Sequence, residues 1–151
     1  MTTYIEQAQA ALLANPQLVA LLTGGIHLFP DSGRKGLTRL QLVQAFSTTT
    51  GLIQPVCIMY QTKTSFTGEA VSMERKFQST KTPISMWIYD DGDAGYDAID
   101  AANDLIYSTL YGFRLTNGYQ ILWGDTIKYK REPLLEDACY YQFVCYAYGH
   151  T

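Results

Sequence analysis

The sequence predicts an α+β fold, a mostly antiparallel sheet of four to five strands with two main helices packed on one face. Two observations predict it. Apolar residues recur every three or four positions near the amino terminus and again around residue 100, which is typical of amphipathic helices. Between Pro55 and Tyr148, several other stretches alternate with a period of two, which is typical of strands. The 151 residues suit one domain, which we assign to residues 1–151.

The amino-terminal element is predicted to be a broken helix. Residues 5–13 place their apolar side chains on one face. Pro16 then interrupts the run, at a position where proline can open a second helical turn. The glycine pair at residues 24–25 ends the helix, because glycine adopts the left-handed conformation at low cost. Residues 26–29 are short and strand-like.

The segment at residues 36–50 has two interpretations. It can form a short helix, capped by Thr38, that turns Leu42, Ala45 and Phe46 inward. It can also form an extended arm. We therefore predict an irregular arm at about residues 34–54.

Strands are expected from residue 56 onward. Residues 56–61 alternate and predict a strand that is buried on at least one face. Residues 71–77 are predicted to pair with residues 84–89 in a long hairpin, assigned to about residues 62–83. The polar residues 62–68 predict a loop or a β-arm that projects from the body.

The second half of the chain predicts one long helix and two more strand regions. Residues 94–111 form an amphipathic helix, with an apolar stripe on one side and aspartates on the other. A strand is expected at residues 119–129, with a bend or bulge at Gly124-Asp125. In the last strand, at residues 138–148, one face is rich in tyrosine. Such a face can be half-buried against another subunit, although tyrosine also suits ordinary sheet surfaces.

Composition favours a protein that assembles with others. Charged residues make up 17% of the chain, below the roughly 25% typical of globular domains, and there are 12 tyrosines and two tryptophans. Tyr and Trp are enriched where proteins contact each other. The net charge is −3, but residues 34–81 carry seven basic and two acidic residues, whereas residues 82–113 carry six aspartates and no basic residue. Such a chain can bind copies of itself head to tail in a ring, or both stretches face solvent.

Three aspartates after an apolar run raise the question of a metal site. A calcium-binding loop needs glycine at its sixth position and glutamate at its twelfth. Counted from Asp90, glycine comes third and Ala101 is twelfth. Aspartate also suits a strand-to-helix junction, because it accepts the free amides of a first helical turn. We interpret Asp90, Asp91 and Asp93 as such a junction and expect no metal or other cofactor.

The motifs of common catalytic sites are absent from the sequence. There are two histidines, and His27 lies between apolar neighbours, as a structural side chain does. Cys57, Cys139 and Cys145 form no CxxC pair, so we expect reduced, buried thiols. The sequence contains no GxSxG, P-loop or GxGxxG motif. We therefore expect no enzyme.

Two groups of basic residues bear on nucleic-acid binding. They are Arg34, Lys35 and Arg39 on a loop, and Arg75 and Lys76 beside phenylalanines on the hairpin. Basic residues interleaved with aromatics can hold a single strand. However, no RRM or OB signature is present and the density of positive charge is modest. A ring whose lumen carries basic side chains and lets DNA pass fits equally well.

The order of these segments resembles the tail-terminator and tail-completion proteins of long-tailed bacteriophages. The segments that carry the resemblance are LLTGGIHLFPD, PVCIMYQ, MWIYDD followed by an amphipathic helix, and YYQFVCYAY. The resemblance implies an α+β subunit that forms a ring, usually a hexamer, at the head-proximal end of the tail tube. Such a ring ends tube growth and provides the surface for head–tail joining. No catalytic residue is implied.

The resemblance also implies partners and a location. The partners are other copies of the chain, the tail tube protein and a head–tail connector or neck protein, with DNA passing through the lumen without specific binding. The location is the virion tail, after assembly in the host cytoplasm. From charge and loop length we expect contacts at the arm, the hairpin and the acidic helix face. The expected subunit or tube interface residues are Arg34, Lys35, Arg39, Lys63, Arg75, Lys76, Asp97, Asp100 and Asp104.

Other functions remain open. They are a neck or minor tail protein of similar plan, a tube-like subunit, a nucleic-acid-binding module and a small enzyme. The amino-terminal residues lack the basic lead of a signal peptide, and no apolar run approaches the ~18 residues that a membrane span requires. We therefore expect a soluble protein that is not exported by the usual route and does not bind membranes.

Overall fold

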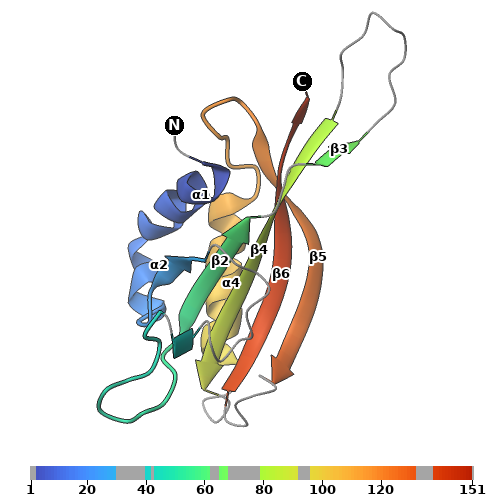
Figure 1. Cartoon of the computed structure of the whole chain (residues 1–151). Coiled ribbons are helices and arrows are strands. Elements are labelled where there is room, and N and C mark those ends of the chain that lie inside the picture. The colour runs from blue at the N-terminus through green and yellow to red at the C-terminus, as the bar shows by residue number, and fades with distance from the viewer. Residues whose placement is uncertain are drawn as a thin grey trace, which may run out of the picture.

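The computed structural model describes residues 3–29, 40–41, 43–61, 65–67, 79–91, 96–131 and 138–150, with residues 65–67, 79, 125–131, 138 and 150 described by backbone alone. The elements are α1 (Tyr4–Leu13), α2 (Pro16–Leu21), β1 (Ile26–Leu28), β2 (Val56–Gln61), β3 (Ser65–Thr67), β4 (Ser79–Asp91), α4 (Asp97–Leu110), β5 (Gln120–Arg131) and β6 (Ala138–His150). Strands lie in the order β1-β2-β4-β6-β5, and β3 pairs with β4 off this path (Figure 1). Only β1 with β2 is parallel among these pairs. The predicted α+β class is confirmed.

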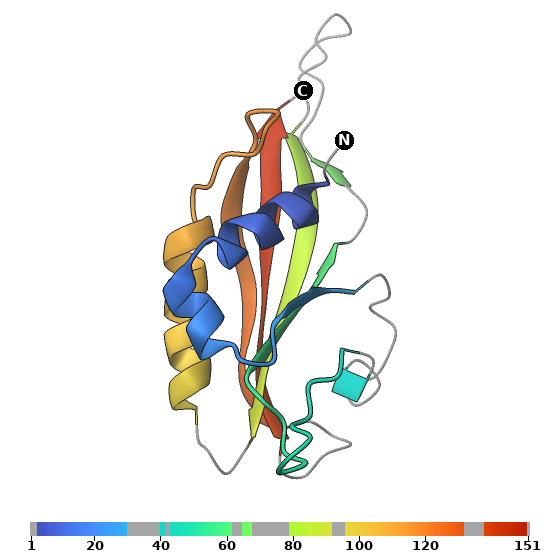
Figure 2. The ribbon, with the colours of Figure 1, turned by 90° about the vertical axis from the view of Figure 1, so that its left-hand side faces the viewer.

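The helices cover one face of the sheet and form the main core. In Figure 2, α1 crosses in front of the strands and α4 runs alongside them. Alternate residues of the strands face the helices, including Met59 of β2, Met86 of β4 and Phe143 of β6, which are fully buried. They meet the apolar stripe of α4, formed by Ile99, Ala102, Ile106 and Leu110. The apolar side chains that the strand and helix patterns of the sequence identify therefore pack into the same core.

Residues 43–55 pack against the opposite face of the sheet. Leu40 and Ala45 are fully buried there against Ile58, Trp87 and Tyr89 of the central strands. A bridge between Phe46 and Ile53 closes this segment on itself. Ala45 and Phe46 thus turn inward, as the helical interpretation of the arm expected, while Thr38 and Leu42 lie outside the described residues. The described part of the arm is a cover on the second face of the sheet.

The predicted pairing of residues 71–77 with residues 84–89 is wrong. Ile84 to Tyr89 pair with β2 on one side and with β6 on the other. A strand has two hydrogen-bonding edges, and both are occupied, so no third partner can join this stretch. β3 instead pairs with residues 79–81, at the start of β4. Residues 71–77 themselves lie outside the described residues.

Local signals set the remaining boundaries. Oδ1 of Asn15 accepts the amides of Gln17 and Leu18, so α2 begins at Pro16 as predicted. The predicted bulge at Gly124 is confirmed by a register shift between Trp123 and Thr126. A second shift, between Ile127 and Lys130, was not expected. The alternation in the last strand is also confirmed, since its odd-numbered residues are buried and its even-numbered residues half-buried.

The packing of β6 predicts that alanine substitutions at neighbouring residues have very different effects on the free energy of unfolding. Phe143 is fully buried and stacks against Trp123 with ring centroids 5.0 Å apart. Phe143→Ala should lower the free energy of unfolding by about 3–5 kcal/mol, because it removes buried carbon and leaves a cavity. Val144→Ala, on the half-buried opposite face, is the matched control and should cost clearly less. Urea unfolding of both variants checks this, and equal losses would contradict the two-faced packing.

Candidate functional site

Asp90 and Asp91 belong to β4 and do not cap the following helix. β4 continues to Asp91, which pairs with Ala138. The backbone N–H of Asp91 donates to Oδ1 of Asp90 at 2.7 Å. The N-cap of α4 is Tyr96, which makes no capping hydrogen bond through its side chain. The expected strand-to-helix junction is present, but the predicted capping role is wrong for these two residues, because the strand ladder holds them; Asp93 lies outside the described residues.

One flank of α4 combines acidic and aromatic side chains. Asp97, Asp100 and Asp104 are exposed, as predicted, and they share this flank with three tyrosines. Tyr96, Tyr107 and Tyr111 are 37%, 43% and 53% exposed. Positions 96, 100, 104, 107 and 111 follow spacings of four and three, which place them in one row along a helix. We call these six residues the acidic–aromatic stripe.

A chain of ring contacts connects the stripe to the core. The ring centroids of Tyr111 and Tyr107 are 5.1 Å apart, and those of Tyr107 and Trp123 are 4.9 Å apart. Trp123 in turn stacks on the buried Phe143. Aromatic pairs at such separations contribute about 0.5–1.5 kcal/mol each beyond their buried area. Tyr107 and Tyr111 are therefore packed against other rings, as residues at the centres of protein interfaces commonly are.

Sequence reasoning found part of this surface. It identified the three aspartates but missed Tyr96, Tyr107, Tyr111 and Trp123. The spacing of the tyrosines from the aspartates, which continues the same row, was a usable signal. The contact between Tyr107 and Trp123 could not be predicted in this way, because it joins elements that are distant in sequence. The six basic residues predicted at the interface, Arg34, Lys35, Arg39, Lys63, Arg75 and Lys76, lie outside the described residues.

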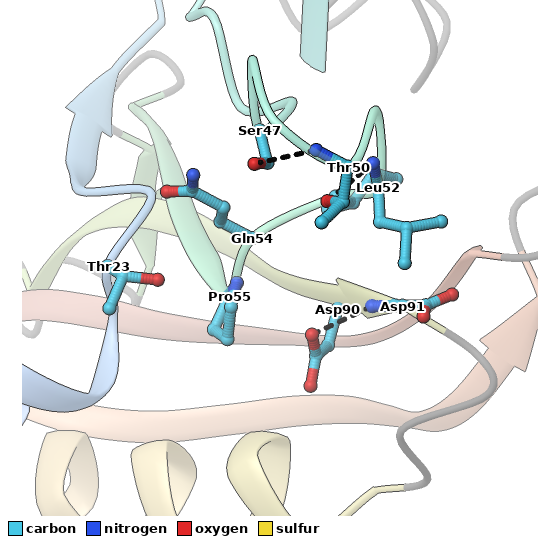
Figure 3. A pocket seen from close by; sticks show the side chains of 9 residues that line it. Thr23, Ser47, Thr50, Leu52, Gln54, Pro55, Asp90 and Asp91 are labelled. Carbon is cyan, nitrogen blue, oxygen red and sulfur yellow. Dashed lines mark hydrogen bonds between the residues drawn. The ribbon is translucent and has the colours of Figure 1, made fainter.

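A cavity of about 500 Å³ opens at the end of β4. Its lining comes from the α2–β1 turn, from the segment before β2 and from the last residues of β4: Thr23, Ser47, Thr50, Leu52, Ile53, Gln54, Pro55, Asp90 and Asp91. Figure 3 shows Thr23 on one side and the two aspartates on the other, with Gln54 and Pro55 between them. The cavity thus combines hydroxyl, amide and carboxylate groups.

Asp90 is the unusual member of this lining. The residue is 3% exposed, and aspartate is rarely buried to this extent unless it is paired. Burial raises the pKa of Asp90 above its ordinary value of 3.8; the Asp91 amide opposes this shift and the Asp91 carboxylate adds to it. The sequence did not reveal this burial, because Asp90 was assigned to a junction.

The glycine turn predicted as a helix stop shapes one wall of the cavity. Gly25 has a φ of +96°, which favours glycine, and the Gly24 amide donates to the carbonyl of Pro55 at 2.8 Å. A Cβ on Gly24 would lie 2.9 Å from Cβ of Val56 and 3.0 Å from the Pro55 oxygen. Only glycine allows this close approach without a shift of β2. The turn therefore sets the distance between Thr23 and the start of β2.

His27 and the three cysteines could in principle support nucleophilic or metal chemistry, but they are hydrogen-bonded or buried within the fold. Nε2 of His27 lies 2.7 Å from the Gly24 carbonyl, to which it donates. The three cysteines form no disulfide and are buried, and burial raises the pKa of the Cys57 and Cys145 thiols to about 12. Within the described part of the chain, no three His, Cys, Asp or Glu side chains gather as a metal site would require. No helix among the described residues is long and apolar enough to cross a membrane.

Comparison with known proteins shows a similarity of fold. No protein-family model matches the sequence, and no curated protein matches it. Among solved structures, a chain from a structure described as "Virion of native gene transfer agent (GTA) particle" is similar, with a TM-score of 0.52. The likeness covers 95% of this chain and 92% of that chain, at 16% sequence identity. The two chains therefore share a fold over nearly their whole length.

The burial of Asp90 predicts a stability that depends on pH. Because the folded pKa lies above the unfolded one, the folded state holds this proton more tightly, and that stabilisation is lost as the pH rises through the folded pKa. Asp90→Asn keeps an oxygen for the Asp91 amide and removes the charge. The variant should therefore melt at a higher temperature than the wild type at pH 7, and the difference should vanish below about pH 3.8.

Thermal unfolding between pH 3 and pH 8 checks this prediction. Glu6→Gln, on the exposed first turn of α1, is the control and should change the melting temperature little at any pH. If Asp90→Asn proves less stable than the wild type at pH 7, the bond to the Asp91 amide outweighs the cost of burying the charge.

Proposed function

We propose that the chain is a structural protein of a phage-like virion, which forms a ring at the head-proximal end of the tail tube. In this role it ends tube polymerisation and provides the surface for head–tail joining. The observation that carries the proposal is the likeness of fold, over nearly the whole of both chains, to a chain of a gene transfer agent virion. A fold alone does not establish a function, so the surface must also suit assembly.

The acidic–aromatic stripe of α4 suits contact with a neighbouring subunit. It presents three aspartates and three exposed tyrosines. The same chain carries seven basic and two acidic residues between positions 34 and 81. In such a ring the acidic surface of one copy contacts the basic segments of the next, which is a head-to-tail arrangement. The ring requires neither internal symmetry within the chain nor a second protein. Tyrosine then supplies contact area while opposite charges select the register.

The proposed role needs no catalytic group. The thiols of Cys57 and Cys145 are protonated at neutral pH, since their pKa is about 12, and thiols are nucleophilic only as thiolates. The ring of His27 is engaged by a backbone carbonyl. The partners in this role are other copies of the chain, the tail tube protein and a head–tail connector or neck protein, with DNA passing through the lumen.

Removal of the gene from its phage or phage-like particle tests the role directly. Electron microscopy of the lysate should show overlong tubes without heads, because nothing stops polymerisation. Tails of normal length beside unattached heads would instead indicate a neck or joining protein. Normal virions would contradict a tail function altogether.

Charge reversal in the stripe tests the proposed subunit contact. Asp104→Lys places a like charge against the basic segments of the neighbour. A loss of about 1.4 kcal/mol at each contact weakens that contact tenfold, so the number of completed particles should fall about tenfold or more. Ala10→Lys is the control, because Ala10 is exposed on α1, away from the stripe residues of α4. Particle counts after complementation of the deletion give the result, with melting temperatures to confirm folding. Equal loss in both variants, or no loss in either, would remove the stripe from the interface.

A further inference from the structure

The second face of the sheet carries apolar side chains that belong to neither core. Leu122, Val144 and Tyr146 are half-buried, and none of the three packs against either core cluster of the described residues. Leu122 pairs with Tyr146, and Tyr146 pairs on its other side with Pro83. Because paired residues share a face, these side chains form a row across β5, β6 and β4, on the face that points away from the helices.

A neighbouring row on the same face carries positive charge. Gln120 of β5 pairs with Tyr148 of β6, which pairs with Lys81 of β4. A bridge joins Arg114 to Gln120 on the outer side of β5, so the row extends to the exposed Arg114. Lys81 and Arg114 are the charged members of the two rows, and neither row contains an acidic residue. We call these two rows, together with Val144, the tyrosine face.

Tyr146 lies at the centre of the tyrosine face. Nζ of Lys81 lies 5.3 Å from the centroid of the Tyr146 ring. On the side of β5 the ring passes close to Gly124, where a Cβ would overlap the Cε2 atom of the tyrosine. Glycine at the bulge therefore leaves room for the ring. A tyrosine that is packed against its neighbours within an apolar surface is typical of the residues that contribute most to binding in protein interfaces.

We propose that the tyrosine face receives the acidic–aromatic stripe of a neighbouring copy, a contact that rests on the proposed function and adds to it the second surface of the ring interface. The charges are complementary, because the stripe carries three aspartates and the tyrosine face carries Lys81 and Arg114. Lys81 is also a member of the basic stretch at residues 34–81. Tyrosines on both surfaces supply contact area, and the opposite charges select the register.

The two surfaces also match in size. The stripe extends over about 22 Å from Tyr96 to Tyr111, at about 1.5 Å per helical residue. The tyrosine face extends over about 14 Å from Val144 to Tyr148, and its charged row crosses three strand spacings, which is again about 14 Å. The stripe is therefore long enough to cover the whole face. A helix on a sheet is also the packing that α4 already has on the opposite face of its own sheet.

The contact joins two different surfaces, which lie on opposite sides of the subunit. Figure 2 shows α4 on one side of the sheet, and the tyrosine face belongs to the other side. Each copy can therefore bind one neighbour through its stripe and another through its tyrosine face, as a ring requires. Single-stranded nucleic acid also binds surfaces that combine aromatic and basic residues, but such surfaces usually carry a denser basic patch than two cations.

Charge exchange in the purified chain tests this contact. Lys81→Glu and Asp104→Lys each place like charges in the contact, so each should weaken self-association about tenfold or more. The double variant restores opposite charges across the contact and should recover most of that loss. Sedimentation equilibrium over a range of protein concentrations gives the association constants, and melting temperatures confirm that each variant folds.

Gln17→Glu is the control, because Gln17 is exposed on α2, outside both surfaces. It should neither weaken self-association nor restore that of Asp104→Lys. A wild-type chain that stays monomeric, single reversals without effect, or a double variant no better than the singles would overturn the contact. So would binding of an oligo-dT strand that Lys81→Glu abolishes in a chain that does not self-associate, since the face would then belong to nucleic acid. These measurements use no particles, so the deletion phenotype tests the proposed function separately.

Discussion

The pairing of β4 on both of its edges is the constraint on which the rest of the structure depends. Its ladder with β6 runs from Ser79 opposite His150 to Asp91 opposite Ala138, while β2 and β3 occupy the other edge. Since strand side chains alternate between faces, this one register sends Met86 to the helices and Trp87 to the segment at residues 43–55. Both cores are therefore set by the same row of hydrogen bonds.

The same alternation explains the position of Asp90. Ile84, Met86 and Ile88 face the helices, and the next residue of that parity is Asp90. The ladder thus places a carboxylate at the end of a buried row. A polar group so placed raises the energy of the folded chain unless another group compensates it.

The helix α4 differs from this end of β4, because its aspartates are exposed. Its apolar stripe lies on the sheet, which leaves the acidic–aromatic stripe exposed along the adjacent flank. Trp123 supports Tyr107 from β5, so the exposed rings are anchored to the core through Phe143. The sheet, a helix with one buried apolar face and one exposed acidic–aromatic flank, and a polar cavity at one end give this small fold several distinct surfaces. Such surfaces, and not the fold itself, distinguish proteins that share it.

The sequence by itself determined the class of fold, the helices, the bulge at Gly124, the alternation in β6 and the exposure of Asp97, Asp100 and Asp104. These are local properties, since a residue's period and its turn chemistry depend on near neighbours. Only the tertiary structure decided which strands pair, that residues 43–55 cover the second face, and that Asp90 is buried. Periodicity tells which side of a strand is apolar but not which strand lies beside it, because pairing joins residues far apart in the chain. The candidate cavity, built from three such distant segments, was therefore beyond the reach of sequence reasoning.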